Sequence, residues 1–187
     1  MTDLENRLAA VPAVGRPPVL PDGDVGYALH ETPVGTLLLA TAGGRVVASS
    51  FADEQTVTHR LARAISPRVL RQPKATDQVR RQLDEYLAGK RRTFDLDVDL
   101  ALATSFQREV LTGLAATVPF GATTTYGGLA GEIHKPRAAR AIGHALGSNP
   151  LCIVLPCHRV IGASGALTGY AGGIEAKRYL LDLEAAA

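Results

Sequence analysis

Five apolar residues, Leu151 to Leu155, stand between Pro150 and Pro156 and lead directly to Cys157. A proline disfavours helical backbone in the residue before it, so this run favours an extended segment over a helix. An apolar run without polar alternation also indicates burial on both sides. The chain must therefore fold so that a buried segment ends at a thiol.

The residues around that thiol are of the kinds that make a cysteine reactive. A cysteine attacks as its thiolate, which needs a nearby base, cation or helix N-terminus, and His158 and Arg159 directly follow Cys157. Neighbouring side chains of an extended segment point apart, so contact between Cys157 and His158 requires a bridging water or a tight turn. The second cysteine, Cys152, lies inside the apolar run and is more simply a small core residue. We expect Cys157 to be the nucleophile.

A carboxylate on the last predicted helix is a candidate partner for His158. Glu184 follows Leu180 by one helical turn and therefore shares its apolar face. A buried carboxylate requires a partner. Two pairings fit the pattern: Glu184 orients His158, or it pairs with Lys177 on the same helix face.

Composition excludes several classes of protein. The 187 residues are 46% hydrophobic and 20% charged, which fits a packed globular protein of one large or two small domains and excludes a disordered or fibrous chain. We find no apolar run long enough for a signal peptide or for the ~20 residues of a membrane helix. We expect a cytoplasmic protein without a membrane partner, whose two cysteines stay reduced. The net charge of +2 is a weak signal for nucleic acid, so DNA binding must be judged from local cations.

The first half of the chain has the alternation and turns of a small antiparallel β-sheet. Strand patterns run from Val25 to Phe51, with a turn at Thr32–Gly35, and helical patterns follow at about Glu54–Ile65 and Thr76–Leu87. A short segment near Phe94–Val98 is placed to rejoin the sheet. We predict a flexible, proline-containing arm over residues 1–24, an α/β domain over 25–100 and a second domain over 101–187.

The second half has the pattern of three short helices joined by tight turns, which resembles a helix-turn-helix. Thr104–Gln107 is a capping-box pattern that starts the first helix, the second runs from about Tyr126 to Ile133, and the third starts at Pro136. On the third helix, Ala138, Ala139, Ile142, Ala145 and Leu146 share one side, and Arg137, Arg140, Ala141, His144 and Ser148 share the other. The cationic side fits either DNA or solvent.

The sequence gives little indication of a metal-binding site. Asp95, Asp97 and Asp99 alternate, but the glycine and glutamate of an EF-hand loop are not in place, so a solvated strand face is the better interpretation. A zinc site from both cysteines, His144 and His158 lacks the usual paired spacing. We expect neither a metal nor a cofactor.

Six segments of the second half together match one family, and they are Tyr126–Ala130, Arg140–Gly143, Asn149-Pro150, Pro156–Val160, Tyr170–Gly173 and Lys177–Glu184. The Pro-Cys-His-Arg-Val segment with its flanking motifs is highly specific. Residues 106–184 therefore resemble the O6-alkylguanine-DNA alkyltransferases, which are suicide DNA-repair methyltransferases. Residues of the first half resemble the family's N-terminal domain more loosely, through Thr32–Gly35.

The resemblance implies an α+β fold, with a small N-terminal antiparallel β-sheet domain with helices followed by a helical, winged-helix-like (helix-turn-helix) domain for DNA binding and catalysis. It also implies a reaction. Cys157 takes the alkyl group from O6-alkylguanine, and from O4-alkylthymine, in a single turnover. His158 acts through a water, Glu184 holds His158, and Asn149 fixes the turn beside the thiol.

The same resemblance implies how DNA is held. Arg140 enters the duplex in place of the flipped base, while Tyr126 crowds the backbone phosphate and meets the guanine. The small residues Ala138, Ala139 and Gly143 lie in the minor groove of double-stranded DNA. The substrate pocket is formed by Val160, Arg159 and Tyr170. No obligate protein partner is implied.

Two positions and the absence of N-terminal cysteines depart from the family pattern. Leu111 stands where many members have tryptophan, and Ala171 replaces a serine whose hydroxyl lies near guanine O6. No cysteine precedes Cys152, so we expect no structural zinc of the kind some members carry. The alternatives are a lesion-binding protein that does not repair, although such members lack the acceptor cysteine, and a winged-helix regulator, which has no use for Cys157.

Overall fold

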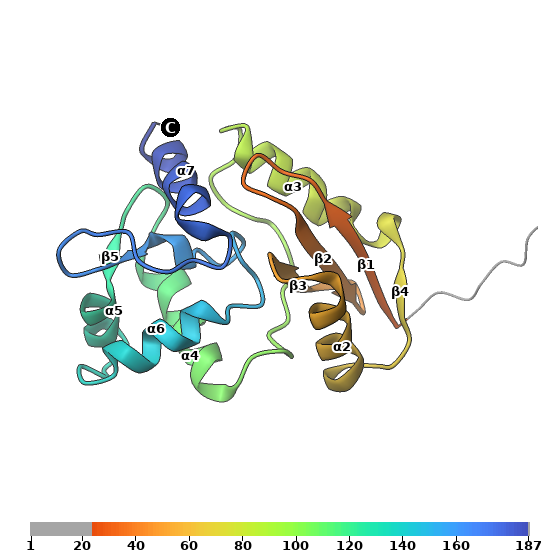
Figure 1. Ribbon diagram of the computed structural model, residues 1–187, viewed down its shortest axis with the longest axis horizontal. Coiled ribbons are helices and arrows are strands. Elements are labelled where there is room, and N and C mark those ends of the chain that lie inside the picture. The colour runs from red at the N-terminus through yellow and green to blue at the C-terminus, as the bar shows by residue number, and fades with distance from the viewer. Residues whose placement is uncertain (1–23, 187) are drawn as a thin grey trace, which may run out of the picture.

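The two halves of the chain differ in secondary structure, as Figure 1 shows for this computed structural model, which describes residues 24–186. A sheet with flanking helices forms the first half, and helices form most of the second. This confirms the predicted α+β architecture. The winged-helix comparison and the domain boundaries stay predictions, and all of the predicted arm except Asp24 lies outside the described residues.

A four-stranded sheet of order β3-β2-β1-β4 organises the first half. Its elements, in chain order, are β1 (Val25–His30), β2 (Leu37–Ala42), β3 (Arg45–Ser50), α2 (Glu54–Ala64), β4 (Val69–Arg71), the short 3-10 helix η1 (Pro73–Thr76) and α3 (Asp77–Leu87). The predicted antiparallel pairing holds for β1, β2 and β3. The sequence interpretation missed β4, which adds a strand parallel to β1 and makes the sheet mixed.

Side chains of β2 alternate between two cores, because successive residues of a strand face opposite sides of the sheet. Leu38 and Ala40 pack with Leu61 of α2. Leu37 and Leu39 face the other way, into a core that also contains buried residues of α3 and of the second half. The two halves of the chain therefore share one hydrophobic core.

The outer edge of β3 fixes the path of two segments, one in the linker between the halves and one in the second half. Val46 pairs with Val98, so the predicted return of residues 94–98 to the sheet is a single bridge. Ser49 receives the segment that leads to the thiol: its amide donates to the Pro150 carbonyl at 2.8 Å, and its carbonyl accepts from the Cys152 amide at 2.7 Å. The sheet of the first half thus anchors the reactive segment.

The second half contains α4 (Ser105–Thr117), β5 (Thr124–Thr125), α5 (Tyr126–Glu132), α6 (Ala139–Gly147), the 3-10 helix η2 (Cys157–Arg159), β6 (Val160–Ile161) and α7 (Gly173–Ala186). The predicted capping box opens α4, since Thr104 and Gln107 exchange side-chain-to-backbone hydrogen bonds of 2.7 and 3.3 Å. β5 and β6 pair in parallel, with Thr124 opposite Val160 and Thr125 opposite Ile161. Within residues 24–186, no helix has the length and apolarity to cross a membrane.

Two sequence predictions about local structure are wrong. Helix α6 begins at Ala139 and not at Pro136, because residues 135–138 form a turn in which the Ala138 amide donates to the Lys135 carbonyl at 2.8 Å. The run from Leu151 to Leu155 is not extended throughout. Ile153 has φ of 71°, a left-handed conformation that costs a β-branched residue about 1–3 kcal/mol, and the chain turns there so that Cys152 bridges Leu155.

Candidate active site

Cys157 is the first residue of η2, at the end of this turn, and only 6% of it is exposed. Asn149 holds the thiol. Its Nδ2 donates to Cys157 Sγ at 3.1 Å and to the Leu155 carbonyl at 3.0 Å, and its Oδ1 accepts from the Leu151 amide at 2.9 Å. One amide side chain therefore fixes both ends of the turn and the position of the sulfur.

His158 follows in η2 and is fully buried. Its Nε2 lies 2.7 Å from Glu184 Oε1 on α7. Burial lowers the pKa of His158, so the ring is neutral at pH 7 and Nε2 carries the proton that it donates to the carboxylate. Nδ1 has no hydrogen-bond partner among the described residues and is thus a free acceptor. Of the two pairings proposed for Glu184, the contact with His158 is the one observed.

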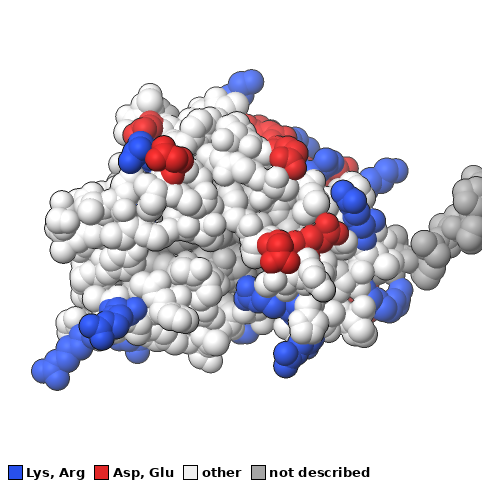
Figure 2. Space-filling model, in the orientation of Figure 1, with Lys and Arg blue, Asp and Glu red and all other residues white. Residues whose placement is uncertain are grey.

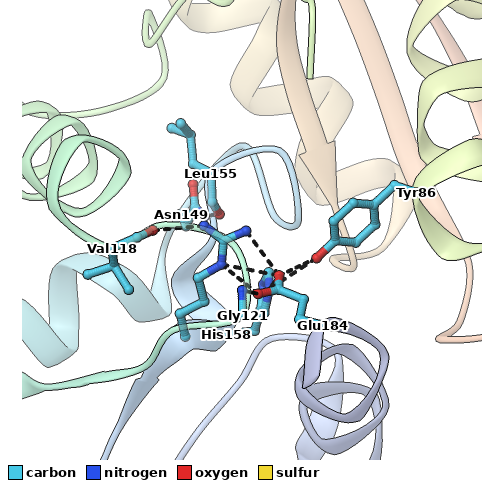
Figure 3. Close-up of polar contacts among 8 residues, drawn as sticks. Tyr86, Val118, Gly121, Asn149, Leu155, His158 and Glu184 are labelled. Carbon is cyan, nitrogen blue, oxygen red and sulfur yellow. Dashed lines mark hydrogen bonds and ion pairs between the residues drawn. The ribbon is translucent and has the colours of Figure 1, made fainter. Parts of the chain in front are cut away.

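Glu184 is the centre of a buried polar cluster (Figure 3). Arg159 donates to both carboxylate oxygens from Nε, at 3.1 and 2.9 Å, and the amide of Gly121 donates at 2.9 Å. The hydroxyl of Tyr86 also bonds Oε1. Burial alone would raise the pKa of Glu184, but hydrogen bonds from His158, Arg159 and Tyr86 outweigh it and hold that pKa at about 2. The carboxylate is charged at neutral pH.

Lys177 is buried as well, but it binds the loop that follows β6. Its Nζ donates to the carbonyls of Val160 and Thr168, at 2.6 and 2.8 Å. These contacts tie both ends of the loop after β6 to α7, so the alternative pairing of Lys177 with Glu184 does not form. The charge of Lys177 lies near Cys157 and helps to lower the pKa of the thiol.

Two tyrosines border the same loop. Tyr126, at the start of α5, has its hydroxyl 3.0 Å from Thr168 Oγ1. The Tyr170 ring packs edge-on against Phe51, at 5.6 Å between centroids, and stands at 6.4 Å from the ring of His158. Phe51 follows β3, so the first half of the chain supports this wall of the site.

The buried and exposed sides of α6 agree with the helical projection of the sequence. Ile142, Ala145 and Leu146 are buried, whereas Arg137, Arg140, Ala141 and His144 are exposed. Figure 2 shows basic side chains projecting from the α5–α6 end of the molecule, on a face of the second half that carries little other charge. Ala138, Ala139 and Gly143 are half-buried, and Gly143 lies beside the ring of Tyr126.

Comparison with known proteins decides the family. Residues 105–186 match the model of the 6-O-methylguanine DNA methyltransferase DNA-binding domain, and residues 25–100 match the ribonuclease-like domain of the same enzymes. The chain belongs to this family. It therefore repairs DNA by direct reversal, through transfer of an alkyl group to one of its own cysteines.

Individual relatives of this methyltransferase family agree. A Mycobacterium tuberculosis methylated-DNA–protein-cysteine methyltransferase is 44% identical over 164 residues, covering 86% of this chain and 92% of the relative. The inducible Bacillus subtilis enzyme is 50% identical over 103 residues, which is 55% of this chain and 56% of that enzyme. A crystal structure of the M. tuberculosis O6-methylguanine methyltransferase in complex with DNA aligns with a TM-score of 0.75 at 42% identity, over 86% of this chain and 93% of that one.

In the methyltransferase site, Arg159 makes its observed contacts with protein groups. Its side chain is buried: it donates to Glu184 at 2.9 Å and to the Val118 carbonyl at 2.8 Å, and its guanidinium carbon lies 5.8 Å from the centroid of the Phe120 ring. Its place in the substrate pocket, which the resemblance implies, stays a prediction. The paired N–H donors of a guanidinium match a carboxylate better than the uncharged edge of a base, which explains why the Arg159 side chain points toward Glu184. Arg159 therefore supports Glu184.

Sequence reasoning missed Tyr86. It lies on the apolar face of α3, where the sequence pattern predicts a core residue. Its hydroxyl contacts Glu184 only because the two halves of the chain pack together. The expectation of no metal stays a prediction. Within the described part of the chain, no group of three or more histidine, cysteine, aspartate or glutamate side chains is arranged to hold a metal ion.

Proposed function

We propose that Cys157 is the acceptor, that the lesion is O6-alkylguanine, and likewise O4-alkylthymine, in double-stranded DNA, and that each molecule reacts once. The observation that carries the proposal is the arrangement around the thiol. Asn149 donates a hydrogen bond to Cys157 Sγ. His158, which directly follows Cys157, is bound to the charged Glu184 through Nε2, and its Nδ1 has no partner among the described residues. This is the arrangement that a thiolate nucleophile with a neighbouring base requires.

The transfer is an in-line displacement at the alkyl carbon. The thiolate of Cys157 forms the C–S bond while the bond from carbon to guanine O6 breaks, and the electron pair moves into the guanine ring, which gains one proton. The proton that Cys157 loses passes to His158 Nδ1 through a water. His158 then releases a proton to water and the guanine takes one up from water, so the net change is thiol plus alkylguanine to thioether plus guanine. A thioether is not readily hydrolysed, so the acceptor is not regenerated.

Glu184 keeps His158 in the tautomer that this step needs. With Nε2–H bonded to the carboxylate, Nδ1 is the accepting nitrogen. When Nδ1 takes up the proton, the negative charge of Glu184 stabilises the imidazolium that forms. Arg159 and Tyr86 hold the carboxylate in place and keep it ionised.

DNA is proposed to bind along the exposed side of α6, with this helix in the minor groove. An alkyl group on O6 is inaccessible inside stacked DNA, so the base must be extruded, which costs a few kcal/mol. Arg140 is exposed and long enough to fill the space that the base leaves. The small residues Ala138, Ala139 and Gly143 leave room for close approach of the DNA backbone.

The extruded base is proposed to enter between the loop after β6 and the start of α5. Tyr126 and Tyr170 provide aromatic surface there, and Tyr126 also crowds the phosphate of the extruded nucleotide. The main chain at Val160, fixed by Lys177, forms the floor of the pocket. Aromatic stacking of an extruded base is favourable whatever alkyl group it carries.

Repair of a methylated duplex at several protein concentrations tests the proposal. We expect the amount of O6-methylguanine lost from the DNA to reach a plateau at one lesion per protein molecule and to be zero with Cys157→Ser. Continued loss beyond that plateau indicates a hydrolase and contradicts the proposal. Binding to DNA without any loss supports a lesion-binding protein or a regulator instead.

A further inference from the structure

The hydroxyls of Tyr126 and Thr168 form a contact to which the mechanism above gives no role. Tyr126 Oη lies 3.0 Å from Thr168 Oγ1. Tyr126 stands at the start of α5 and Thr168 in the loop after β6, so the contact joins the two sides between which the extruded base is proposed to enter. Sequence reasoning gives Thr168 no part in the site. The contact therefore brings a further residue to it.

The main chain of Thr168 is held in place by Lys177 of α7. The side chain of Lys177 is fully buried, and its Nζ donates to the Thr168 carbonyl at 2.8 Å and to the Val160 carbonyl at 2.6 Å. The methyl group of Thr168 lies over Gly162, where an added Cβ atom would stand 3.5 Å from it. A β-branched side chain has few favourable rotamers, so an anchored backbone also fixes the direction of its hydroxyl.

The ring of Tyr126 is held on its other side by α6. It lies against Gly143, where an added Cβ atom would stand 3.5 and 3.6 Å from two carbons of the ring. This is the helix that is proposed to bind DNA. The ring is therefore fixed at its edge by α6 and at its hydroxyl by Thr168.

We propose that Thr168 is a positioning residue for the transfer: its hydroxyl donates a hydrogen bond to Tyr126 Oη and keeps the tyrosine hydroxyl directed at the extruded nucleotide. The proposal rests on the proposed function, and in particular on the proposed contact of Tyr126 with the extruded nucleotide. Thr168 acts through Tyr126, and no bond of Thr168 forms or breaks in the reaction.

The hydrogen-bonding capacity of the two hydroxyls determines which of them donates. A hydroxyl has one proton and two lone pairs, so either can donate to the other in the free protein. Phosphate oxygens only accept hydrogen bonds, so Tyr126 uses its proton for the phosphate that it meets in the complex. Thr168 is then the donor, and the contact persists when DNA binds. Because hydrogen bonds in a chain polarise one another, the bond from Thr168 also makes Tyr126 a stronger donor.

Three substitutions in the full chain isolate the hydroxyl of Thr168. Thr168→Val retains the branched shape without the hydroxyl, Thr168→Ser retains the hydroxyl, and Tyr126→Phe removes its partner. Thr117→Val is the matched control, because Thr117 Oγ1 donates to the Gly113 carbonyl at 2.8 Å within α4. The measurement is the rate of methyl transfer from duplex DNA with O6-methylguanine. The protein is in excess and its concentration is varied, which gives the maximal rate.

We expect Thr168→Val to lower the maximal rate about fivefold, which is the effect of one neutral hydrogen bond. Thr168→Ser should stay within about twofold of the wild type, and Thr117→Val should equal the wild type. Tyr126→Phe should lose more than Thr168→Val does. Adding Thr168→Val to Tyr126→Phe should then have no further effect, because the threonine hydroxyl has no tyrosine hydroxyl to hold.

Four results overturn the proposal. An unchanged rate in Thr168→Val does so, and so does a faster rate, because the bond then closes the entrance. An equal loss in Thr168→Ser and Thr168→Val assigns the effect to packing. A further loss when Thr168→Val is added to Tyr126→Phe shows that Thr168 acts without the tyrosine.

Iodoacetamide labelling of Cys157, located by fragment masses, separates a role through Tyr126 from damage to the loop. The labelling rate should be the same in the wild type and in Thr168→Val, because the carbonyl that binds Lys177 is retained. A changed labelling rate overturns the proposal, since the loop then carries the loss. If the wild type is labelled at Cys157 but removes no methyl group from DNA, the proposed function fails and this proposal fails with it. If Thr168→Val transfers the methyl group as fast as an active wild type, only the role of Thr168 fails.

Discussion

The hydroxyl of Tyr86 donates a hydrogen bond to the carboxylate of Glu184, across 98 positions in sequence and between the two halves of the chain. Burial and the neighbouring carboxylate raise the pKa of Tyr86 well above its ordinary value, so the tyrosine stays neutral and remains a donor. Its ring packs against Phe94 and Phe120, with centroids at 5.2 and 6.0 Å. A residue of the first half thus helps to hold the charged group on which His158 depends.

Tyr86→Phe retains the ring and removes this bond. A hydrogen bond to a charged group contributes about 1.5–3 kcal/mol, so we expect the free energy of unfolding to fall by about 2 kcal/mol. Urea-induced unfolding measures this free energy of unfolding. Tyr27→Phe is the matched control, because Tyr27 donates to Glu54 at 2.6 Å in a half-buried setting, where the loss is smaller. Equal effects of the two substitutions would contradict the role given to Tyr86.

Glu184→Gln is predicted to change how stability depends on pH. The pKa of Glu184 is held at about 2 in the folded chain, below its ordinary 4.5. The stability this contributes, about 3 kcal/mol, is present above pH 4.5 and is lost as the pH falls towards 2. The variant should therefore be much less stable than the wild type at pH 7, with the difference shrinking between pH 4.5 and 2. Glu175→Gln, at an exposed position of α7, should show no such trend.

Substitutions at Asn149 are predicted to change the reactivity of the thiol. Asn149→Ala removes the donor to Cys157 Sγ and raises the pKa of Cys157. Asn149→Asp retains an acceptor for the Leu151 amide but places a negative charge against the thiolate, so its pKa should rise further. The pH dependence of iodoacetamide labelling orders the three proteins. A lower pKa in the aspartate variant than in the alanine variant would count against the proposed contact.

Arg140→Ala should slow repair in duplex DNA far more than reaction with the free base O6-methylguanine. Extrusion costs a few kcal/mol and each 1.4 kcal/mol corresponds to about tenfold in rate, so we expect a loss of tenfold or more in duplex. Arg137→Ala is the control, because Arg137 is equally exposed but precedes α6. Equal losses with duplex and free base would argue against a role in extrusion.

Local pattern was sufficient for much of the fold and part of the site. Alternation predicted β1 to β3, the capping box predicted the start of α4, and helical spacing put Glu184 on a buried face. Each of these features depends on residues close together in sequence. The assignment of Cys157 followed from its immediate neighbours and from the motif around it.

Features that depend on tertiary packing were not predictable in this way. Strand β4 has three residues, too few to show alternation, and the left-handed backbone at Ile153 contradicts the preference of a β-branched residue. Arg159 points inward only because Glu184 and the Val118 carbonyl are there to receive it. Tyr86 meets the site from the other half of the chain.

The most direct test locates the methyl group on the protein. Wild-type protein is incubated with excess duplex containing O6-methylguanine, digested, and its peptides are sequenced by fragment masses. We expect one methyl group per molecule, attached to Cys157, with Cys152 unmodified. A methyl group on any other residue, or an unmodified protein after the lesion has disappeared, would contradict it.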